Sequence, residues 1–403
     1  MHLVTFSNLF PSSVMPGHGS FVYERMRRVA AASGCKWSVV APVPEVIWPL
    51  RRGIYKLWAE VPLHEQWPIE ILVAGEENGQ RVDVYHPRFR HWPGMSQRRQ
   101  ADAVAAGAKS VVAELLAAGD GVLDAHYLWP DGVAAAKIAK ELSVPFTLTA
   151  RGTDVNVLAQ DASLAPRIAE AAGRAHACMA VSDALSKRFA AACKLPESKV
   201  VTVRNGVDLE RFTPGDAAVA RRALGLPESG RIVVSVGRLV TGKGFEVAVR
   251  AVRELPDTTL VLVGDGPERS NLAALGGDHV IFLGTRPADE VATAYQAADV
   301  FVLPSHREGW PNVVTEALAC GLPVVATPVG GIPQIMGGAQ PEAYLGSLVP
   351  VGDVAGFTAA LQRVLDAGKH TSQVRAFAER YGWQEPIEHL VETFRRACGE
   401  VVA

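Results

Sequence analysis

Residues Val300 to Thr327 read "VFVLPSHREGWPNVVTEALACGLPVVAT" and carry the clearest signal of the fold class. This stretch opens with an apolar run, Val300–Pro304, that is typical of a buried strand. A glycine-containing loop follows, and then a helical pattern over Asn312–Cys320 that ends at Gly321, a residue type common just past a helix C-terminus. The segment "PVVAT" then predicts a second buried strand. A strand, a helix and a strand in this order indicate a parallel βαβ unit.

The same alternation of short apolar runs and helical patterns fills the rest of the chain, with helices predicted at Val22–Ala32, Ala101–Ala117 and Gly132–Leu142. The strand-like runs form two series. The first comprises "MHLVTFS", "WSVVAPV", "GVLDAHY", "FTLTARG" and "ACMAVS", and the second "RIVVSVGRL", "TLVLVGDG", "HVIFLGT", "VFVLPS" and "PVVAT". Two such series predict an α/β protein with two Rossmann-like domains. Ligands of open parallel sheets bind beyond the carboxyl ends of the strands, and we expect them in a cleft where the two domains face each other.

The length of 403 residues is too great for a single core, and it favours two domains. Turn signals at Asn205-Gly206 and Pro214-Gly215 indicate where the first domain ends. Tyr381-Gly382 and Pro386 interrupt the last helical pattern. The predicted division is 1–203 for an N-terminal Rossmann-like domain, 204–380 for a C-terminal one, and 381–403 for a helix that packs back on the first domain.

Composition excludes several classes of protein. The net charge of −2 argues against nucleic acid as a partner, because nucleic-acid binding depends on a basic excess. The five cysteines are scattered and form no C-x-x-C pair, which indicates reduced thiols in a cytosolic chain. No signal peptide and no apolar run of about 18 residues is evident. We therefore expect a cytoplasmic protein.

The loop within the opening stretch carries two carboxylates, Glu308 and Glu316. Pro311 suits the first helical position, where its missing N–H costs nothing. The backbone amides from Gly309 to Val313 would then lack intrahelical partners and form an anion site suited to a phosphate. Glu316, one turn into the helix, could accept hydrogen bonds from vicinal hydroxyls such as those of a ribose. The alternative is a solvated loop acid and a surface helix residue.

A second strand-to-helix junction, in "SVGRLVTGKGFEVAV", contains Arg238 and Lys243. Two cations at such a junction can hold a diphosphate, the arginine through its fork and the lysine as a point charge. The turn in "LVLVGDGPERS" places Gly264 after a further strand, which alone is a weak nucleotide signal.

Together these motifs resemble the donor-binding signature of family 4 retaining glycosyltransferases of the GT-B fold. The resemblance covers nearly the whole chain and is densest from Arg204 to Asp353. It implies that 1–203 is an acceptor-side domain and that 204–380 is the nucleotide-sugar (donor) domain. It implies that Glu308 lies beside the donor sugar and that Glu316 binds the ribose. It also implies that Arg238 and Lys243 bind the donor diphosphate. The donor-binding residues expected on this basis are Gly17, Gly19, Arg238, Lys243, Gly264, Arg286, Glu308, Gly309, Trp310, Pro311, Asn312, Val313 and Glu316.

Three motifs of the first domain extend the resemblance. It implies that His126, in "LDAHYLWPDG", faces the donor sugar, whereas a lone histidine is otherwise an ordinary core residue. In "LTARGTDVN", Arg151 stands where the family often has histidine, and Asp154 either contacts the acceptor or caps a helix beginning near Val155. The loop "FPSSVMPGHGSFVYE" contains Gly17 and Gly19, which are expected near the phosphates and the acceptor. The alternative is that this loop is a plain turn.

The segment "IWPLRRGIYKLWAEVPLHEQW" mixes tryptophans with basic residues. This composition suits a membrane interface, but packing of the loop on its own domain is the favoured interpretation. If the acceptor is lipid-linked, this face is where it would arrive, at the inner face of the membrane.

The expected function is transfer of a sugar, with retention, from a nucleotide diphosphate sugar to a hydroxyl of a lipid-linked or cell-surface glycan. Since no D-x-D motif occurs, we expect no metal and no other cofactor. The catalytic residues expected are Glu308, His126, Arg238 and Lys243, in a front-face attack. A nucleotide-sugar 2-epimerase and a non-catalytic nucleotide-sugar-binding protein are the alternatives. The sugar, the base (uracil or guanine), the acceptor and the oligomeric state stay open.

Overall fold

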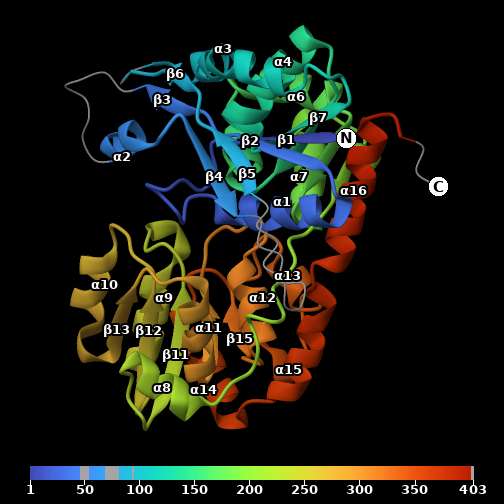
Figure 1. Cartoon of the computed structure of the whole chain (residues 1–403). Helices are drawn as coiled ribbons and strands as arrows, with labels where there is room; N and C mark the ends of the chain where they lie inside the picture. The colour runs from blue at the N-terminus through green and yellow to red at the C-terminus, as the bar shows by residue number, and fades with distance from the viewer. Residues whose placement is uncertain (46–53, 69–80, 93–94, 401–403) are drawn as a thin grey trace. The chain divides into compact units, whose positions relative to one another are not determined.

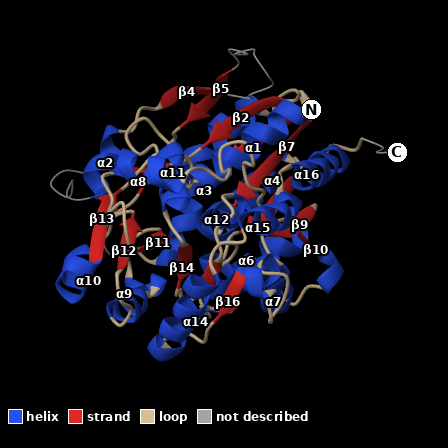
Figure 2. Cartoon of the chain, turned by 90° about the horizontal axis from the view of Figure 1, so that it is seen from below, coloured by secondary structure: helices blue, strands red, loops and turns tan. Residues whose placement is uncertain are grey.

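The computed structural model describes residues 1–45, 54–68, 81–92 and 95–400. The chain divides into two compact units (Figure 1). The first consists of Met1–Arg204 and Gln384–Ala403, and the second of Asn205–Trp383. Each unit has its own largely parallel sheet, with helices (blue) on both sides of the strands (red) in Figure 2. The predicted α/β class with two Rossmann-like domains is thus confirmed.

The first unit is built on an eight-stranded sheet in the order β10-β9-β8-β7-β1-β2-β5-β4. All neighbouring strands in it are parallel except β4 and β5, which are antiparallel. A two-stranded parallel sheet lies apart from it. The strands are β1 (His2–Phe6), β2 (Lys36–Val40), β3 (Val43–Glu45), β4 (His64–Pro68), β5 (Arg81–Tyr85), β6 (Arg88–Arg90), β7 (Gly121–His126), β8 (Phe146–Ala150), β9 (Ala177–Ala180) and β10 (Val200–Thr202).

The core of the first unit joins the two ends of the chain. Met26 of α1 packs in one hydrophobic cluster with Leu390 and Phe394 of α16, the C-terminal helix. The apolar positions of α16 recur at helical spacing, so one face of this helix is buried in the core of the first unit. The helices of this unit are α1 (Ser20–Ser33), α2 (Ile54–Glu60), α3 (Gln97–Leu115), α4 (Val133–Leu142), α5 (Thr153–Asn156), α6 (Ala165–Arg174), α7 (Asp183–Cys193) and α16 (Gln384–Ala397).

The second unit contains a six-stranded, wholly parallel sheet in the order β13-β12-β11-β14-β15-β16. Helices α9 and α14 contribute to the main core cluster on one face of this sheet. The strands are β11 (Arg231–Val236), β12 (Thr258–Val263), β13 (Val280–Gly284), β14 (Val300–Leu303), β15 (Val324–Ala326) and β16 (Gly346–Leu348). The helices are α8 (Ala217–Leu224), α9 (Phe245–Arg253), α10 (Arg269–Gly276), α11 (Ala288–Ala297), α12 (Asn312–Ala319), α13 (Ile332–Ile335), α14 (Val354–Ala367) and α15 (Thr371–Ala378).

Two details of the predicted helices are wrong. Pro386 does not interrupt a helix, because it lies in the first turn of α16, where a missing N–H has no intrahelical partner to lose. Pro311 is not the first helical residue, because its ψ of 100° is extended and α12 begins at Asn312. The break predicted at Tyr381-Gly382 does separate α15 from α16.

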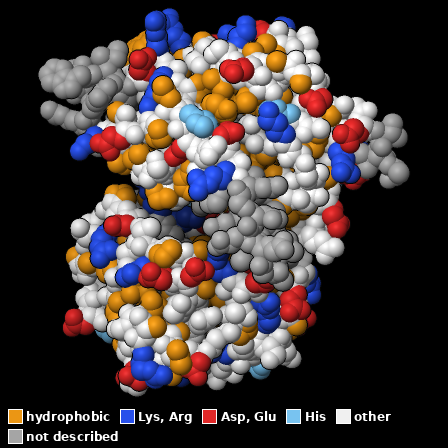
Figure 3. All heavy atoms as spheres, viewed as in Figure 1, with side chains coloured by type: hydrophobic (Ala, Val, Ile, Leu, Met, Phe, Trp, Pro, Cys, Tyr) orange, Lys and Arg blue, Asp and Glu red, His pale blue; other side chains and the backbone are white. Residues whose placement is uncertain are grey.

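The surface mixes both signs of charge, and Figure 3 shows acidic and basic side chains interspersed over the viewed face. This distribution accompanies a net charge of −2. No helix in the described ranges is both long and apolar enough to cross a membrane.

Candidate functional site

The strongest candidate site of the second unit lies where four adjacent strands end, at the carboxyl edge of its sheet. Main-chain hydrogen bonds connect the loops that follow these strands. The N–H of His306 donates to the carbonyl of Gly242 at 3.0 Å, and that of Leu239 donates to Asp265 at 2.9 Å. The loops after β11, β12 and β14 are therefore fixed to one another by their backbones. This edge is where ligands of open parallel sheets bind.

Two glycines allow this close approach. Gly264 has a φ of 130°, and a Cβ atom on it would lie 2.0 Å from the carbonyl oxygen of Gly237. Gly244, which precedes α9, has a φ of 65°, and its Cβ would lie 2.2 Å from the oxygen of Pro304. Any larger residue would force these loops apart. The predicted donor residue Gly264 thus has at least a structural role in this edge.

The predicted catalytic carboxylate and lysine are brought together at this edge. The Nζ atom of Lys243 donates to Oε1 of Glu308 at 2.7 Å, and the hydroxyl of Ser305 donates to the same oxygen at 2.6 Å. The Glu308 side chain is only 9% exposed, whereas that of Lys243 is 27% exposed. Burial and two donors hold the carboxylate in one orientation. The sequence reasoning missed Ser305, although it stands directly after the predicted strand.

Arg238 follows β11 in the same edge. Its side chain is exposed, and it makes no hydrogen bond or ion pair within the described ranges. A guanidinium that is free of protein partners can offer its donors to a ligand. Lys243 is therefore a paired cation at this edge, whereas Arg238 is open to a ligand.

The start of α12 supplies backbone donors. Among the described residues, the N–H groups of Gly309, Trp310, Asn312 and Val313 make no hydrogen bond within the chain. The indole of Trp310 is buried, and its Nε1 also lacks a hydrogen-bond partner. Unpaired amides at a helix N-terminus favour an anion. This arrangement holds even though Pro311 precedes the helix instead of opening it.

Glu316 lies within α12 and is half-buried. Its Oε2 accepts a hydrogen bond from the hydroxyl of Tyr295 at 3.1 Å. Burial, together with the nearby Glu316 charge, raises the pKa of Tyr295 well above its ordinary value, so the tyrosine remains a donor. Tyr295 is a partner that the sequence reasoning missed.

Arg286 lies after β13, where it donates to the carbonyl of Leu283 and to Glu290.

In the first unit, His126 ends β7 and is buried within a network of charged groups. Its Nε2 lies 2.7 Å from Oδ2 of Asp124, and its Nδ1 contacts the guanidinium of Arg151. Since the arginine can only donate, the ring is neutral with its proton on Nε2. Burial lowers the pKa of His126 to about 4, against the Asp124 charge that raises it. Both ring nitrogens thus have protein partners.

Asp124 was missed by the sequence reasoning, although a carboxylate inside the apolar run "GVLDAH" was an available signal. It is fully buried and also accepts a hydrogen bond from Thr147 at 2.7 Å. Burial alone would raise the pKa of Asp124, but His126, Thr147 and the Arg151 guanidinium lower it below the usual value. The fully buried Arg25 lies in the same electrostatic network.

Asp154 serves the backbone around it. Its carboxylate accepts hydrogen bonds from the N–H groups of Arg151, Gly152 and Val155, and also from Leu128 of the neighbouring loop. Burial raises the pKa of Asp154 despite these bonds. The predicted capping position is wrong, because Asp154 lies inside α5 (Thr153–Asn156), which is preceded by Gly152 as its N-cap residue; the carboxylate instead accepts from the backbone on both sides of the helix start.

The two glycines of the first loop differ in their surroundings. Gly19 is the residue before α1, with a φ of 67°, and it contacts the backbone of Leu9 and Phe10. Gly17 is exposed, with open space where a side chain would stand. At Gly19 the loop therefore runs close to the backbone of Leu9 and Phe10, whereas Gly17 has no such neighbour.

The tryptophan-rich segment is described in part. Trp48, Arg51 and Arg52 lie outside the described residues. Trp58 meets the ring of His18 edge-on at 5.2 Å, and Trp67 meets Tyr23 at 5.8 Å. These two tryptophans contact their own unit, in line with the favoured interpretation of packing.

Asp131 is a buried carboxyl group beside the first loop. Its Oδ2 accepts the N–H of Asn8 at 2.8 Å, and its Oδ1 has no hydrogen-bond partner. Burial raises the pKa of Asp131 to about 8. The folded protein therefore keeps a proton that the unfolded chain loses near pH 4, so stability falls as pH rises from about 4 to about 8.

We expect Asp131→Asn to flatten this dependence, because the amide cannot ionise. Between pH 6.5 and 8 the wild-type protein should lose about 2 kcal/mol, or roughly 4–8 °C in melting temperature. Calorimetry at these two pH values measures the loss. The same substitution at the exposed Asp120 should leave the wild-type slope unchanged. A slope that survives in Asp131→Asn would assign the proton to another group.

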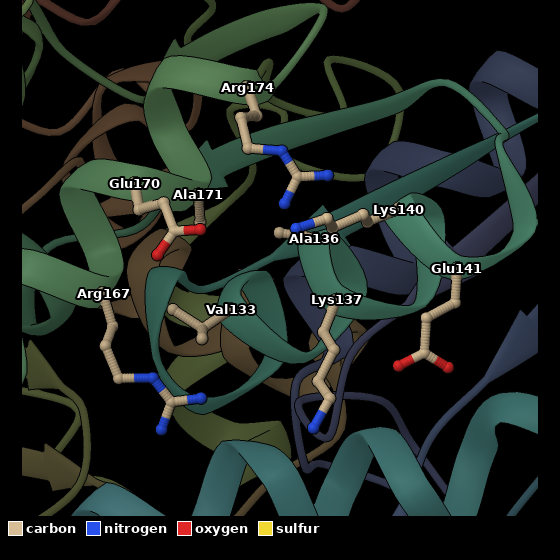
Figure 4. Close-up of a pocket in the computed structure, with 9 residues that line it drawn as sticks. All are labelled: Val133, Ala136, Lys137, Lys140, Glu141, Arg167, Glu170, Ala171 and Arg174. Atoms are coloured by element: carbon tan, nitrogen blue, oxygen red, sulfur yellow. The ribbon is translucent and has the colours of Figure 1, made fainter.

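A groove of about 480 Å³ lies between α4 and α6. Figure 4 shows Arg174 and Lys140 reaching toward each other across it. Other charged side chains in its wall are tied to neighbours, since Asp102 binds both Lys137 and Arg167. None of the predicted site residues lines this groove.

The described ranges contain no group of three or more histidine, cysteine, aspartate or glutamate residues placed to hold a metal ion.

Comparison with known proteins identifies both halves of the chain. Residues 63–211 match the family model "Glycosyltransferase Family 4", and residues 216–381 match "Glycosyl transferases group 1". TuaC of Bacillus subtilis, a glycosyltransferase whose name places it in teichuronic acid biosynthesis, is 33% identical over 343 residues, or 84% of this chain and 83% of TuaC. The D-inositol 3-phosphate glycosyltransferase of Acidothermus cellulolyticus is 38% identical over 224 residues, which span about half of each protein.

Solved structures share the whole architecture. Sucrose-phosphate synthase from Thermosynechococcus elongatus matches with a TM-score of 0.75 at 22% identity, over 98% of each chain. HepE of Anabaena, solved with UDP and glucose, matches with a TM-score of 0.69 at 20% identity, over 98% of this chain and 100% of HepE. These two likenesses establish the fold alone. Taken with the family models and the similarity to TuaC, they show that the chain belongs to the family 4 glycosyltransferases, that it has the GT-B fold, and that it is a transferase.

Proposed function

We propose that this glycosyltransferase moves a sugar from a nucleotide diphosphate sugar to a hydroxyl acceptor with retention of configuration. One observation carries the proposal: the Lys243–Glu308 ion pair and the unpaired amides at the start of α12 lie on the same edge of the sheet. Fixed positive charge beside backbone donors suits a diphosphate. We propose Arg238, Lys243 and these amides as its ligands, and Glu316 as the ligand of the ribose.

The leaving diphosphate gains negative charge as the glycosidic bond breaks, and preorganised donors stabilise that charge. Glu308, held by Lys243 and Ser305, would orient sugar hydroxyls and stabilise the oxocarbenium-like state. A double displacement needs two carboxyl groups about 5 Å apart at the anomeric carbon. With Glu316 assigned to the ribose, that pair is not available. We therefore propose front-face attack, in which the acceptor hydroxyl transfers its proton to the departing phosphate.

The proposal includes no divalent cation, since fixed cations and amides would neutralise the diphosphate. We propose that His126 borders the sugar site with its ring and not with its nitrogens, because both nitrogens already have protein partners. The acceptor is proposed to be a glycan or a lipid-linked sugar. TuaC is named for teichuronic acid biosynthesis, and this supports a cell-surface glycan as the product. HepE was solved with UDP and glucose, and this supports a UDP-sugar as the donor.

A thermal-shift panel of UDP-, GDP- and ADP-sugars, each with and without EDTA, tests this function. A ligand that binds only the folded state at a hundred times its Kd should stabilise it by about 2.7 kcal/mol. We expect a UDP-sugar to give the largest shift, and EDTA to leave both the shift and nucleotide release unchanged. The absence of any shift, or loss of release upon chelation, would contradict the proposal. An epimer formed without acceptor would instead identify an isomerase.

A further inference from the structure

The first unit contains a smaller pocket that the proposed function has not used. Its volume is about 230 Å³. It opens at the carboxyl edge of the sheet, since Asn8 follows the end of β1 and Pro42 follows the end of β2. Ligands of parallel sheets bind at this edge. The described residues that line the pocket are Asn8, Pro42, Pro44, Trp58, Phe89, His91 and Gln100.

The lining combines flat apolar surfaces with amide groups. Trp58, Phe89 and the two prolines supply apolar area. Neither Asn8 nor Gln100 makes a side-chain hydrogen bond within the described ranges, so both amides can donate to and accept from a ligand. No lysine, arginine, aspartate or glutamate is among the described lining residues. Apolar walls with a few polar groups are typical of small-molecule sites, and the neutral amides among the described lining residues favour an uncharged ligand.

The pocket is held in place by its surroundings. Arg88 donates to the carbonyl of Trp58 at 2.9 Å and also to Val61, which fixes the end of α2. The ring of His18 meets Trp58 edge-on, and its Nε2 lies 3.0 Å from the carbonyl oxygen of Asn8. The N–H of Asn8 in turn donates to Asp131. A preformed site of this kind loses little conformational entropy on binding.

We propose that this pocket binds one uncharged pyranose ring of the acceptor, with a C–H face of the sugar on Trp58 and its hydroxyls on Asn8 and Gln100. The volume agrees, because an apolar cavity of about 150 Å³ accommodates benzene and a hexose ring with its hydroxyls is larger. Drug-sized ligands need about 300 Å³ or more, so the pocket takes a single ring. The inference rests on the proposed transfer to a glycan, and it names the chemical class of the acceptor's terminal unit.

Saturation-transfer NMR with four methyl glycosides, those of glucose, galactose, N-acetylglucosamine and glucuronic acid, tests the inference on the full chain. Glycerol 3-phosphate serves as the charged comparison. We expect at least one uncharged glycoside to bind, and Trp58→Ala to weaken it on the order of tenfold or more, as the loss of an aromatic anchor does. Trp58→Phe, which keeps an aromatic face, should retain most of the binding.

Trp92→Ala is the matched control, because Trp92 is 46% exposed and is not among the described lining residues. It should bind the glycosides like the wild type. If Trp58→Ala does not fold, Gln100→Ala on the surface of α3 tests the polar side of the same pocket and should weaken binding. Three results would overturn the inference: no glycoside binds, the variants bind equally well, or only glucuronide or glycerol 3-phosphate binds.

The UDP-sugar thermal shift, recorded on the same variants, separates the two proposals. A normal shift in Trp58→Ala with lost glycoside binding supports the pocket and leaves the donor site intact. A wild-type protein that binds glycosides but no nucleotide sugar would refute the proposed donor function and not the pocket.

Discussion

Lys243→Ala is expected to lower the turnover number by about 10²-fold or more, the range for removing one preorganised group that stabilises developing charge. The substitution removes the cation 2.7 Å from Glu308 and takes a counter-charge from the departing diphosphate. Steady-state release of nucleoside diphosphate, with the donor found in the thermal-shift panel, measures the effect. Lys243→Arg should recover part of the activity, because it keeps the charge but not its geometry.

Lys109→Ala is the matched control for this variant. Lys109 forms an exposed ion pair with Glu141 at 2.6 Å, far in sequence from the site. Its loss should leave turnover within about twofold, since exposed pairs contribute at most about 1 kcal/mol to stability. A Lys243→Ala enzyme with near-normal turnover would remove Lys243 from the mechanism. If its penalty vanishes in a Glu308→Gln background, the lysine acts only by holding Glu308.

Asp124→Ala should destabilise the first unit by about 3–5 kcal/mol, as removal of one member of a buried charge network does. Asp124 has no exposed surface, and its carboxylate is an anion that acts on the fully buried Arg25 and on the half-buried Arg151. Without it, Arg25 remains desolvated and loses the carboxylate that acts on its charge, whereas Arg151 keeps Asp154 as a second anion. Urea and thermal unfolding, followed with hydrogen exchange in β7, would measure the loss.

Asp102→Ala tests the same type of side chain in an exposed setting. Asp102 also binds two cations, Lys137 and Arg167, but its side chain is 45% exposed. We expect a change within about 1 kcal/mol. Thr147→Val removes a hydrogen bond from Asp124 without removing charge, and it should fall between the two. Equal effects of Asp124→Ala and Asp102→Ala would contradict the assigned role of the buried network.

The sequence predicted β11 to β15 well because these strands read as unbroken apolar runs, and all of them except the half-buried β13 are largely buried. It did not predict the three-residue β16. It also did not predict β4 and β5, which form the antiparallel edge of the first sheet. The segment "RVDVY" alternates polar and apolar residues, and its partner "HEQWP" has no apolar run. Edge strands of this kind carry a weaker signal than central ones.

Within the candidate sites, single residues were easier to predict than their partners. Glu308 and Lys243 were recognisable from local motifs, but their 2.7 Å contact joins residues 65 positions apart. His126 was recognisable too, whereas its link to Arg151 depends on β7 and β8 lying side by side. Local pattern shows which element carries a side chain, and only the assembled sheet shows what that side chain meets.

The backbone contacts at Gly244 and Gly264 have a consequence for how such an enzyme can change over time. The frame of the donor edge is built from main-chain atoms, so it does not depend on the identity of the side chains that project from it. Exchanging those side chains could retune the preferred sugar while the scaffold stays intact. Replacing either glycine would instead disturb several loops at once, so we expect natural diversification of this enzyme to spare these two positions.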